Sequence, residues 1–328
     1  MTVTPNPALD LTWHVDRLQP GETHRIDPGA ARAGGKGLNV ARVLHSGRRE
    51  VVAVTTTGGA VGAEFAAELA ASGIPHRLVP VGGATRRSIA IVDETSGDAT
   101  VLNERGIALE PDEAAALAAN ALELGRTADA VAICGSLPPG FGPDELGALV
   151  RTLVDGGVPV IVDTSGPGLA AAARAGATAL KPNAEELRAE TGLDDPVAGA
   201  RALLGLGARL VVASLGSEGL LVVSADAPGG IRARLPRTLH GNATGAGDAA
   251  VAAIAAAFAE TPTLGADTRE AADARARLAR RATAWSASAV LMPFAGDLAP
   301  EHSALELEVV VTTTSTDGSV GTDPEASA

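Results

Sequence analysis

The chain has 328 residues, of which 46% are hydrophobic and only 2% aromatic, so we expect one large core filled mainly by Ala, Val and Leu. The formal net charge of −13 and the lack of a basic stripe with interleaved aromatic residues exclude nucleic acid as an expected partner. Cys134 has no second cysteine to pair with, and no basic-then-apolar signal opens the chain, so we expect a cytoplasmic protein. The longest apolar run, Ala249–Ala259, is shorter than the roughly 20 residues that cross a bilayer, so we expect no membrane partner.

Short apolar runs alternate with Ala-rich stretches along most of the chain. The apolar runs predict strands at Val51–Thr55, Ala130–Cys134, Val158–Asp163, Ala179–Lys181, Leu210–Ser214 and Gly219–Val223. The other stretches predict helices at Leu38–His45, Gly62–Ala71, Pro111–Leu124, Pro143–Asp155, Gly168–Ala175, Ala184–Thr191, Pro196–Leu206, Gly247–Ala259 and Thr268–Ala287. This alternation is typical of β-α-β units around a mainly parallel sheet, and the expected class is α/β.

Two regions break the alternation, at about residues 11–25 and 85–105. Both show polar and apolar residues in turn, so they predict strands of a small second sheet, which would form a lid over the main one; the alternative is an ordinary edge hairpin. Residues 1–311 are expected to form one domain. Residues 312–328 are rich in Thr, Ser, Gly, Asp and Glu without a basic residue, and they predict a disordered acidic tail.

The turn Thr244–Asp248, sequence TGAGD, runs directly into the apolar helix. Its glycines allow close backbone approach, and the helix N-terminus directs free N–H groups and positive potential toward whatever binds there. The turn therefore predicts a phosphate site, with Asp248 as a base that takes a proton from an attacking hydroxyl. The alternative is a common Gly-rich loop capped by an Asp. The turn lacks the Gly-Lys-Ser/Thr of a Walker motif, and the chain does not open with the GxGxxG of a dinucleotide fold.

Two segments together resemble the signatures of the ribokinase-like (PfkB) carbohydrate kinases: Ala33–Arg42, sequence AGGKGLNVAR, and Thr244–Asp248. The resemblance runs from about Thr2 to Pro293. It implies a three-layer α/β/α fold with a small β-sheet lid, and ATP with Mg²⁺ as cofactors. Within the family, the segments Thr4–Asp10, Cys134–Gly140 and Lys181–Leu187 resemble the phosphosugar branch, which contains 1-phosphofructokinase, tagatose-6-phosphate kinase and the minor 6-phosphofructokinase.

At the sugar end, the resemblance implies that Asp10 accepts hydrogen bonds from sugar hydroxyls and that the sugar lies against a glycine turn. The implied sugar-binding residues are Asp10, Gly34, Gly35, Lys36, Asn39, Arg86 and Ser136. A substrate that already carries a phosphate needs cations, because a buried unpaired dianion is prohibitive; the candidates are Lys36, Arg86 and Arg87. The alternatives are a capping role for Asp10 and a solvated strand face for the two arginines.

The lid strands depart from the branch pattern at two positions. Ser88 stands where Asn is usual, and Arg105 follows Asn103-Glu104 where a small residue or Pro is common. Because a shorter hydroxyl cannot make both amide contacts, Ser88 places the sugar preference in doubt.

At the nucleotide end, the resemblance implies that Asn183 and Glu186 organise Mg²⁺ through water, while Lys181 approaches phosphate oxygens. It implies a nucleotide contact at Ser214, Gly216 and Gly219 and phosphate contacts at Thr244, Gly245 and Gly247. Gly245, Ala246 and Gly247 belong to the catalytic turn beside Asp248, and the N–H groups of Ala246, Gly247 and Asp248 would stabilise the transferred charge. Ser286–Pro293 would line the adenine side. The alternatives are helix capping for Asn183 and Glu186 and a hairpin turn at Ser214–Gly219. Cys134 and the six histidines show no metal-binding spacing.

The expected function is therefore an ATP-dependent phosphosugar kinase that acts on fructose 1-phosphate or tagatose 6-phosphate, with fructose 6-phosphate as a further option. Its partners would be the sugar phosphate and ATP, with a homodimer through the lid as a further expectation. A kinase of an unphosphorylated sugar or nucleoside is the first alternative. A sugar-phosphate-binding protein without turnover is the second. A dehydrogenase is disfavoured, because the glycine turn lies late in the chain.

Overall fold

The main sheet of the computed structural model explains the alternating sequence pattern. The structure describes residues 1–225, 230–264, 268–314 and 320–322. Within them, eleven strands form one sheet in the order β15-β14-β13-β12-β11-β10-β9-β8-β1-β4-β5. Neighbours from β5 to β11 are parallel, and the pairs from β11 to β15 are antiparallel. The bounds are β1 (Thr2–Thr4), β4 (Ala53–Thr57), β5 (His76–Pro80), β8 (Val131–Cys134), β9 (Val160–Asp163), β10 (Ala179–Leu180), β11 (Leu210–Ser214), β12 (Leu220–Ser224), β13 (Ile231–Arg234), β14 (Val310–Thr314) and β15 (Val320–Thr322).

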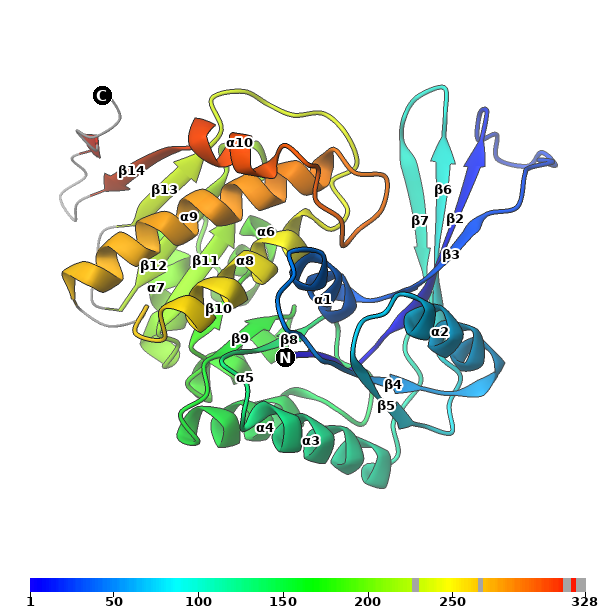
Figure 1. The fold of residues 1–328 in the computed structure, drawn as a ribbon, viewed down its shortest axis with the longest axis horizontal. Helices are drawn as coiled ribbons and strands as arrows, with labels where there is room; N and C mark the ends of the chain where they lie inside the picture. The colour runs from blue at the N-terminus through cyan, green and yellow to red at the C-terminus, as the bar shows by residue number, and fades with distance from the viewer. Residues whose placement is uncertain (226–229, 265–267, 315–319, 323–328) are drawn as a thin grey trace.

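Helices cover both faces of this sheet, which gives the expected three layers (Figure 1). One core cluster is closed by α1 (Lys36–Ser46), α2 (Gly59–Ala71), α8 (Ala246–Glu260), α9 (Arg269–Val290) and α10 (His302–Glu308). The other is closed by α3 (Pro111–Gly125), α4 (Pro143–Asp155), α5 (Pro167–Arg174), α6 (Ala184–Thr191) and α7 (Pro196–Leu206). Among the described helices, none is both long and apolar enough to cross a membrane.

Helix α8 is the most deeply buried of these helices for a reason visible in its sequence. Every residue from Asp248 to Phe258 is buried, and most of them are alanines. Small side chains allow a helix to be enclosed on all sides by α1, α9 and the sheet. The buried helix fixes the position of its own N-terminus, which carries the TGAGD turn.

The lid is a separate four-stranded sheet in the order β3-β2-β6-β7, with bounds β2 (Ala8–Val15), β3 (Ala30–Gly34), β6 (Arg86–Asp93) and β7 (Ala99–Asn103). Figure 1 shows it projecting from the main body beside β4 and β5. The prediction of a second sheet is confirmed. Its boundaries differ, because β2 begins at Ala8, residues 16–25 contain no strand, and β3 lies in a segment where none was predicted.

The predicted elements of the main domain are present, and three helices, α4, α6 and α7, match residue for residue. The structure adds β1, β5, β13, β14, β15, α10 and a short 3₁₀ turn at Gly216–Glu218. The prediction of a disordered acidic tail is wrong in part. Residues 312–314 continue β14, which pairs with β13, and Val320–Thr322 form β15. β-branched Thr and Val favour strands even in a polar segment. Residues 315–319 and 323–328 of that prediction lie outside the described residues.

Candidate active site

The carboxyl ends of the parallel strands open into a cavity of about 1460 Å³. Loops after β1, β8 and β10 bring Asn6, Ser136 and Lys181 to it, and the N-termini of α1, α6 and α8 point toward it. Open α/β sheets place ligand sites at this edge. The individually predicted site residues line the cavity except Arg87 and Gly34, and Gly34 lies behind Asp10.

The TGAGD turn presents free amides at the start of α8. Gly245 adopts a left-handed conformation (φ 89°) and caps the helix without a side-chain hydrogen bond. The Ala246 N–H donates to the Ala243 carbonyl oxygen at 3.3 Å, so the predicted contribution of that amide is already engaged. Gly247 and Asp248 have no backbone acceptor one turn earlier, and their N–H groups remain for a ligand. A Cβ on Gly247 would lie 3.2 Å from Lys181 Nζ, so the glycine also leaves room for that lysine.

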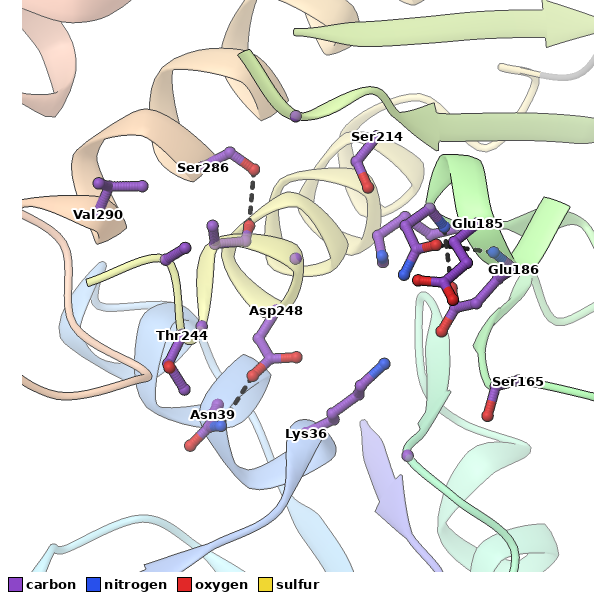
Figure 2. A pocket seen from close by; sticks show the side chains of 18 of the residues that line it. Lys36, Asn39, Ser165, Glu185, Glu186, Ser214, Thr244, Asp248, Ser286 and Val290 are labelled. Carbon is purple, nitrogen blue, oxygen red and sulfur yellow. Dashed lines mark hydrogen bonds between the residues drawn. The ribbon is translucent and has the colours of Figure 1, made fainter. Parts of the chain in front are cut away.

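Asp248, in the first turn of α8, is 6% exposed, and its side chain contacts the first turn of α1. Asn39 Nδ2 donates a hydrogen bond of 2.8 Å to Asp248 Oδ2, as Figure 2 shows. Burial, reinforced by the negative charge of Asp163, raises the pKa of Asp248 to about 6, although Lys36, Asn39 and Lys181 oppose the shift. A carboxylate with this pKa is mostly ionised near neutral pH and basic enough to take a proton.

Asp163, at the end of β9, holds both lysines of the chain. Its Oδ1 lies 3.2 Å from Lys36 Nζ and 3.5 Å from Lys181 Nζ, and the residue is fully buried. Its Oδ2 is buried without a hydrogen-bond partner among the described residues. Burial lowers the pKa of Lys36, but Asp163, Asp248 and Glu186 outweigh it and raise the pKa above its usual range.

Asp163 is a site residue that the sequence did not predict. The available signal was its position at the carboxyl end of a predicted strand, the same edge to which Lys181 was assigned.

Asp10 lies at the lid end of the cavity, beside Arg86. A Cβ on Gly34 would fall 1.9 Å from Asp10 Oδ2, so only glycine at position 34 allows this carboxylate position. Burial raises the pKa of Asp10 to about 6, against the opposing charge of Arg86 and with a smaller contribution from Asp248. Asn6 Nδ2 donates 2.9 Å to Ser136 Oγ, which joins the loop after β1 to the loop after β8.

The two lid arginines predicted to bind phosphate lie differently. Arg86 lines the cavity, and its terminal nitrogens donate to the carbonyl oxygens of Glu104 and Asn6 at 3.3 Å each. Arg87 does not line the cavity, since consecutive strand residues face opposite sides, and its place in the phosphate site was wrongly predicted. Ser88 and Arg105, the two departures from the family pattern, do line it.

Asn183 and Glu186 form a capping box at the start of α6. The Glu186 N–H donates to Asn183 Oδ1 at 2.8 Å, and the Asn183 N–H donates to Glu186 Oε2 at 2.9 Å. The capping alternative is therefore present, but both residues also line the cavity. Figure 2 shows Glu186 beside Glu185. In the described part of the chain, no cluster of His, Cys, Asp or Glu could hold a metal by itself. Mg²⁺ keeps several waters and uses few protein carboxylates alongside phosphates, so these oxygen donors suit it.

The far end of the cavity lies between β11 and α9. Ser214, Gly216 and Gly219 line it at the end of β11, and the turn is also the hairpin given as the alternative, since Leu215 N–H donates to the Gly219 carbonyl oxygen at 2.8 Å. From α9, Ser286 Oγ donates 2.6 Å to the Ala246 carbonyl oxygen. Val290, one turn further, also lines the cavity. Residues 237–241 line this end as well and were not predicted, because they form no regular element.

Comparisons with known proteins show the family of the chain. The model of a family described as pfkB family carbohydrate kinase matches residues 5–290. A 1-phosphofructokinase of Xanthomonas campestris pv. campestris is 38% identical over 272 residues, covering 80% of this chain and 85% of the relative. A 1-phosphofructokinase of Rhodobacter capsulatus is 39% identical over 298 residues, covering 88% and 89%.

Among solved structures, phosphofructokinase-2 from Escherichia coli in complex with potassium superposes with a TM-score of 0.82 at 29% identity, covering 92% of this chain and 96% of the other. That Escherichia coli protein has also been solved in complex with substrates and products and in a tetrameric inhibited form.

Proposed function

Because the chain belongs to the pfkB family of carbohydrate kinases, we propose that it transfers the γ-phosphoryl group of ATP to the free primary hydroxyl of a ketohexose phosphate. Fructose 1-phosphate is the favoured substrate, as in the two bacterial relatives, ahead of tagatose 6-phosphate and fructose 6-phosphate. The main support for this proposal is that buried Asp248 lies beside free helix amides in a cavity that the lid residues Asp10 and Arg86 also line.

Asp248 acts as the general base in this proposal. Its carboxylate accepts the proton of the sugar hydroxyl while the hydroxyl oxygen forms a bond to the γ-phosphorus. The bond between that phosphorus and the oxygen bridging to the β-phosphate breaks, and ADP keeps the bridging oxygen. The N–H groups of Gly247 and Asp248 donate to the oxygens of the transferred group, where the α8 N-terminus favours negative charge.

Lys36 and Lys181 supply positive charge on the other side of the transferred group. Their shared contact with Asp163 restricts both side chains before substrate arrives, at 3.2 and 3.5 Å. Preorganised charge needs no rearrangement during the reaction, and that is its main contribution to rate. Asn183, Glu185 and Glu186 would hold Mg²⁺ through water, and the bound ion would neutralise phosphate charge.

A kinase of an unphosphorylated sugar remains the second candidate. The observation in its favour is that two Arg86 nitrogens already donate to carbonyl oxygens, which reduces the capacity of this residue for a phosphate. A panel of fructose 1-phosphate, tagatose 6-phosphate, fructose 6-phosphate, fructose and ribose, each with ATP and Mg²⁺ in a coupled ADP-release assay, separates the two. Turnover of the free sugars alone would replace the phosphosugar proposal.

Asp248→Asn tests the mechanism. Because the amide keeps the shape and loses the basic oxygen, kcat should fall by about 10²–10⁴-fold. The melting temperature should not fall, since burial already disfavours the charged form of this carboxyl. Asp273→Asn, an exposed carboxyl on α9, is the matched control and should keep full activity. An Asp248→Asn variant with wild-type turnover would contradict the role of the base.

We also propose that two copies associate through the lid. Every residue of β7 is exposed, and Val101 and Leu102 are 46% and 55% exposed. An exposed strand with apolar residues offers both an unpaired backbone edge and apolar surface to a second copy. The molar mass in solution, measured by light scattering, tests this proposal, and a monomer at assay concentrations would contradict it.

A further inference from the structure

The cations that line the cavity differ in how far they are already neutralised. Lys36 and Lys181 both contact Asp163. Arg237 makes two hydrogen bonds to Glu308, of 2.8 and 3.0 Å. An incoming phosphate would have to compete with these carboxylates for each of the three cations.

The two remaining cations are on the lid. Arg86 donates to the carbonyl oxygens of Asn6 and Glu104. Arg105 lines the cavity, is exposed, and makes neither a hydrogen bond nor an ion pair within the part of the chain that the structure describes. It is therefore the cavity cation whose full hydrogen-bonding capacity faces solvent and ligand, five N–H donors in a planar arrangement.

The backbone around Arg105 is held in place although its side chain is free. The Glu104 N–H donates 3.0 Å to the Arg87 carbonyl oxygen, which continues the strand pairing of β7 with β6. On the other side, a Cβ on Gly106 would fall 2.4 Å from Asn6 Oδ1, so this glycine packs directly on the Asn6 side chain. Arg105 thus lies in a segment held on one side by the pairing with β6 and on the other by contact with Asn6, which lines the cavity.

We propose that Arg105 binds the phosphate that the sugar substrate already carries, and so sets the preference for phosphorylated over free sugars. The inference rests on the proposed function. Asp10 and Glu104 line the same end of the cavity and repel a dianion. An arginine can offset this repulsion and bind phosphate oxygens through two parallel hydrogen bonds. Because Arg105 follows β7, the same contact would draw the lid onto the bound sugar.

The test compares Arg105→Ala, Arg105→Lys and Arg87→Ala with fructose 1-phosphate and with fructose as substrates. Arg105→Ala should raise the KM for fructose 1-phosphate about tenfold, leave the KM for ATP unchanged and leave kcat/KM for fructose unchanged. Arg105→Lys should recover part of the loss, because it keeps the charge but not the paired hydrogen bonds. Arg87→Ala removes the same charge from the opposite side of the lid and should behave as wild type.

Ionic strength gives a readout that a merely structural role would not move. The contact is exposed to solvent, so added salt should raise the wild-type KM for fructose 1-phosphate more steeply than that of Arg105→Ala. Equal KM values in wild type and Arg105→Ala, while wild type phosphorylates fructose 1-phosphate, would overturn this inference and leave the proposed function standing. A wild-type protein that turns over fructose but no phosphosugar would overturn both.

Discussion

Asp248 and Asp10 both line the cavity, and burial raises the pKa of each to about 6. Burial makes ionisation of each carboxyl harder than it is in water, so each is ionised near neutral pH but gains a proton as the pH falls through about 6. Asp248 must be ionised to accept a proton, and Asp10 accepts hydrogen bonds best as a carboxylate. Both requirements act in the same direction on the pH dependence.

The acid limb of kcat/KM for the sugar should therefore fall below about pH 6, reporting the two carboxyls together. Asn39→Ala removes a hydrogen bond that favours ionised Asp248, so it should raise the pKa of Asp248 further and shift the limb to higher pH. The pH profile of kcat/KM measures this. Asn120→Ala, on α3, removes a similar amide away from the cavity and should leave the profile in place. An unshifted limb in Asn39→Ala would contradict the assignment.

At this scale, the sequence predicted which side chains carry the chemistry better than it predicted which of them contact one another. Asp248, Lys36 and Lys181 stand inside recognisable motifs, and the structure places all three at one cavity. Asp163 follows an ordinary apolar strand, so its importance appears only when folding brings two distant lysines to its carboxylate. Arg105 was visible as a departure from a pattern, but its lack of a partner is a three-dimensional fact.

At the scale of elements, strand β3 shows how the lid shapes the site. Gly34 ends β3 and pairs with Ala8 of β2, and the space that its missing side chain leaves is filled by Asp10. A methyl group there would lie 1.9 Å from Asp10 Oδ2, far inside any permitted contact. The Asp10 side chain would have to move, because the backbone pairing of the two strands leaves the methyl group no other direction.

We therefore expect Gly34→Ala to lower kcat/KM for the sugar by about tenfold or more, with a stability cost of about 1–3 kcal/mol for the overpacking. Steady-state kinetics and denaturant unfolding measure the two effects. Gly205→Ala on α7 is the matched control, since a Cβ there meets nothing within 4 Å. It should keep full activity and gain up to about 1 kcal/mol of stability as a helix substitution. Wild-type kinetics in Gly34→Ala would show that Asp10 does not need this position.

The sequence predicted best those elements in which apolar and polar side chains alternate with a regular period. Helices α4, α6 and α7 begin with Pro or after Asn and end at clear boundaries, and their limits were correct. Strands β3, β5 and β13 have short or mixed patterns, with exposed or half-buried residues. Such strands are defined by the neighbours to which they hydrogen-bond, and for β13 one of these neighbours, β14, is distant in sequence.

At the scale of the whole molecule, an ion pair joins the lid to the segment 295–297, which packs on the TGAGD turn. Arg32 on β3 donates two hydrogen bonds to Asp297, of 2.9 and 3.0 Å, and a third of 3.1 Å to the Ala295 carbonyl oxygen. Ala295 in turn packs on Gly245, where a Cβ would fall 2.8 Å from Ala295 Cα. A continuous set of contacts therefore runs from the lid strand that pairs with Asp10 to the N-cap of α8.

The pair also keeps Arg32 occupied. Arg32 lies opposite Asp10 in the register of β2 and β3, and its charge already lowers the pKa of Asp10. Without Asp297, the guanidinium would be free to pair with Asp10 and compete with the sugar. Removing either partner should consequently weaken sugar binding, by loosening the lid in one case and by this competition in the other.

A double-mutant cycle on kcat/KM for the sugar, at saturating ATP, tests whether the two residues act as one unit. Arg32→Ala and Asp297→Ala should each lower kcat/KM about fivefold, and the double variant should be no worse than either, a coupling of about 1 kcal/mol. Arg281→Ala breaks a comparable pair with Glu260, of 2.8 Å, between α9 and α8, and should leave sugar kinetics unchanged. If the two losses simply multiplied in the double variant, Arg32 and Asp297 would act independently. The ion pair would then not couple the lid to the TGAGD turn.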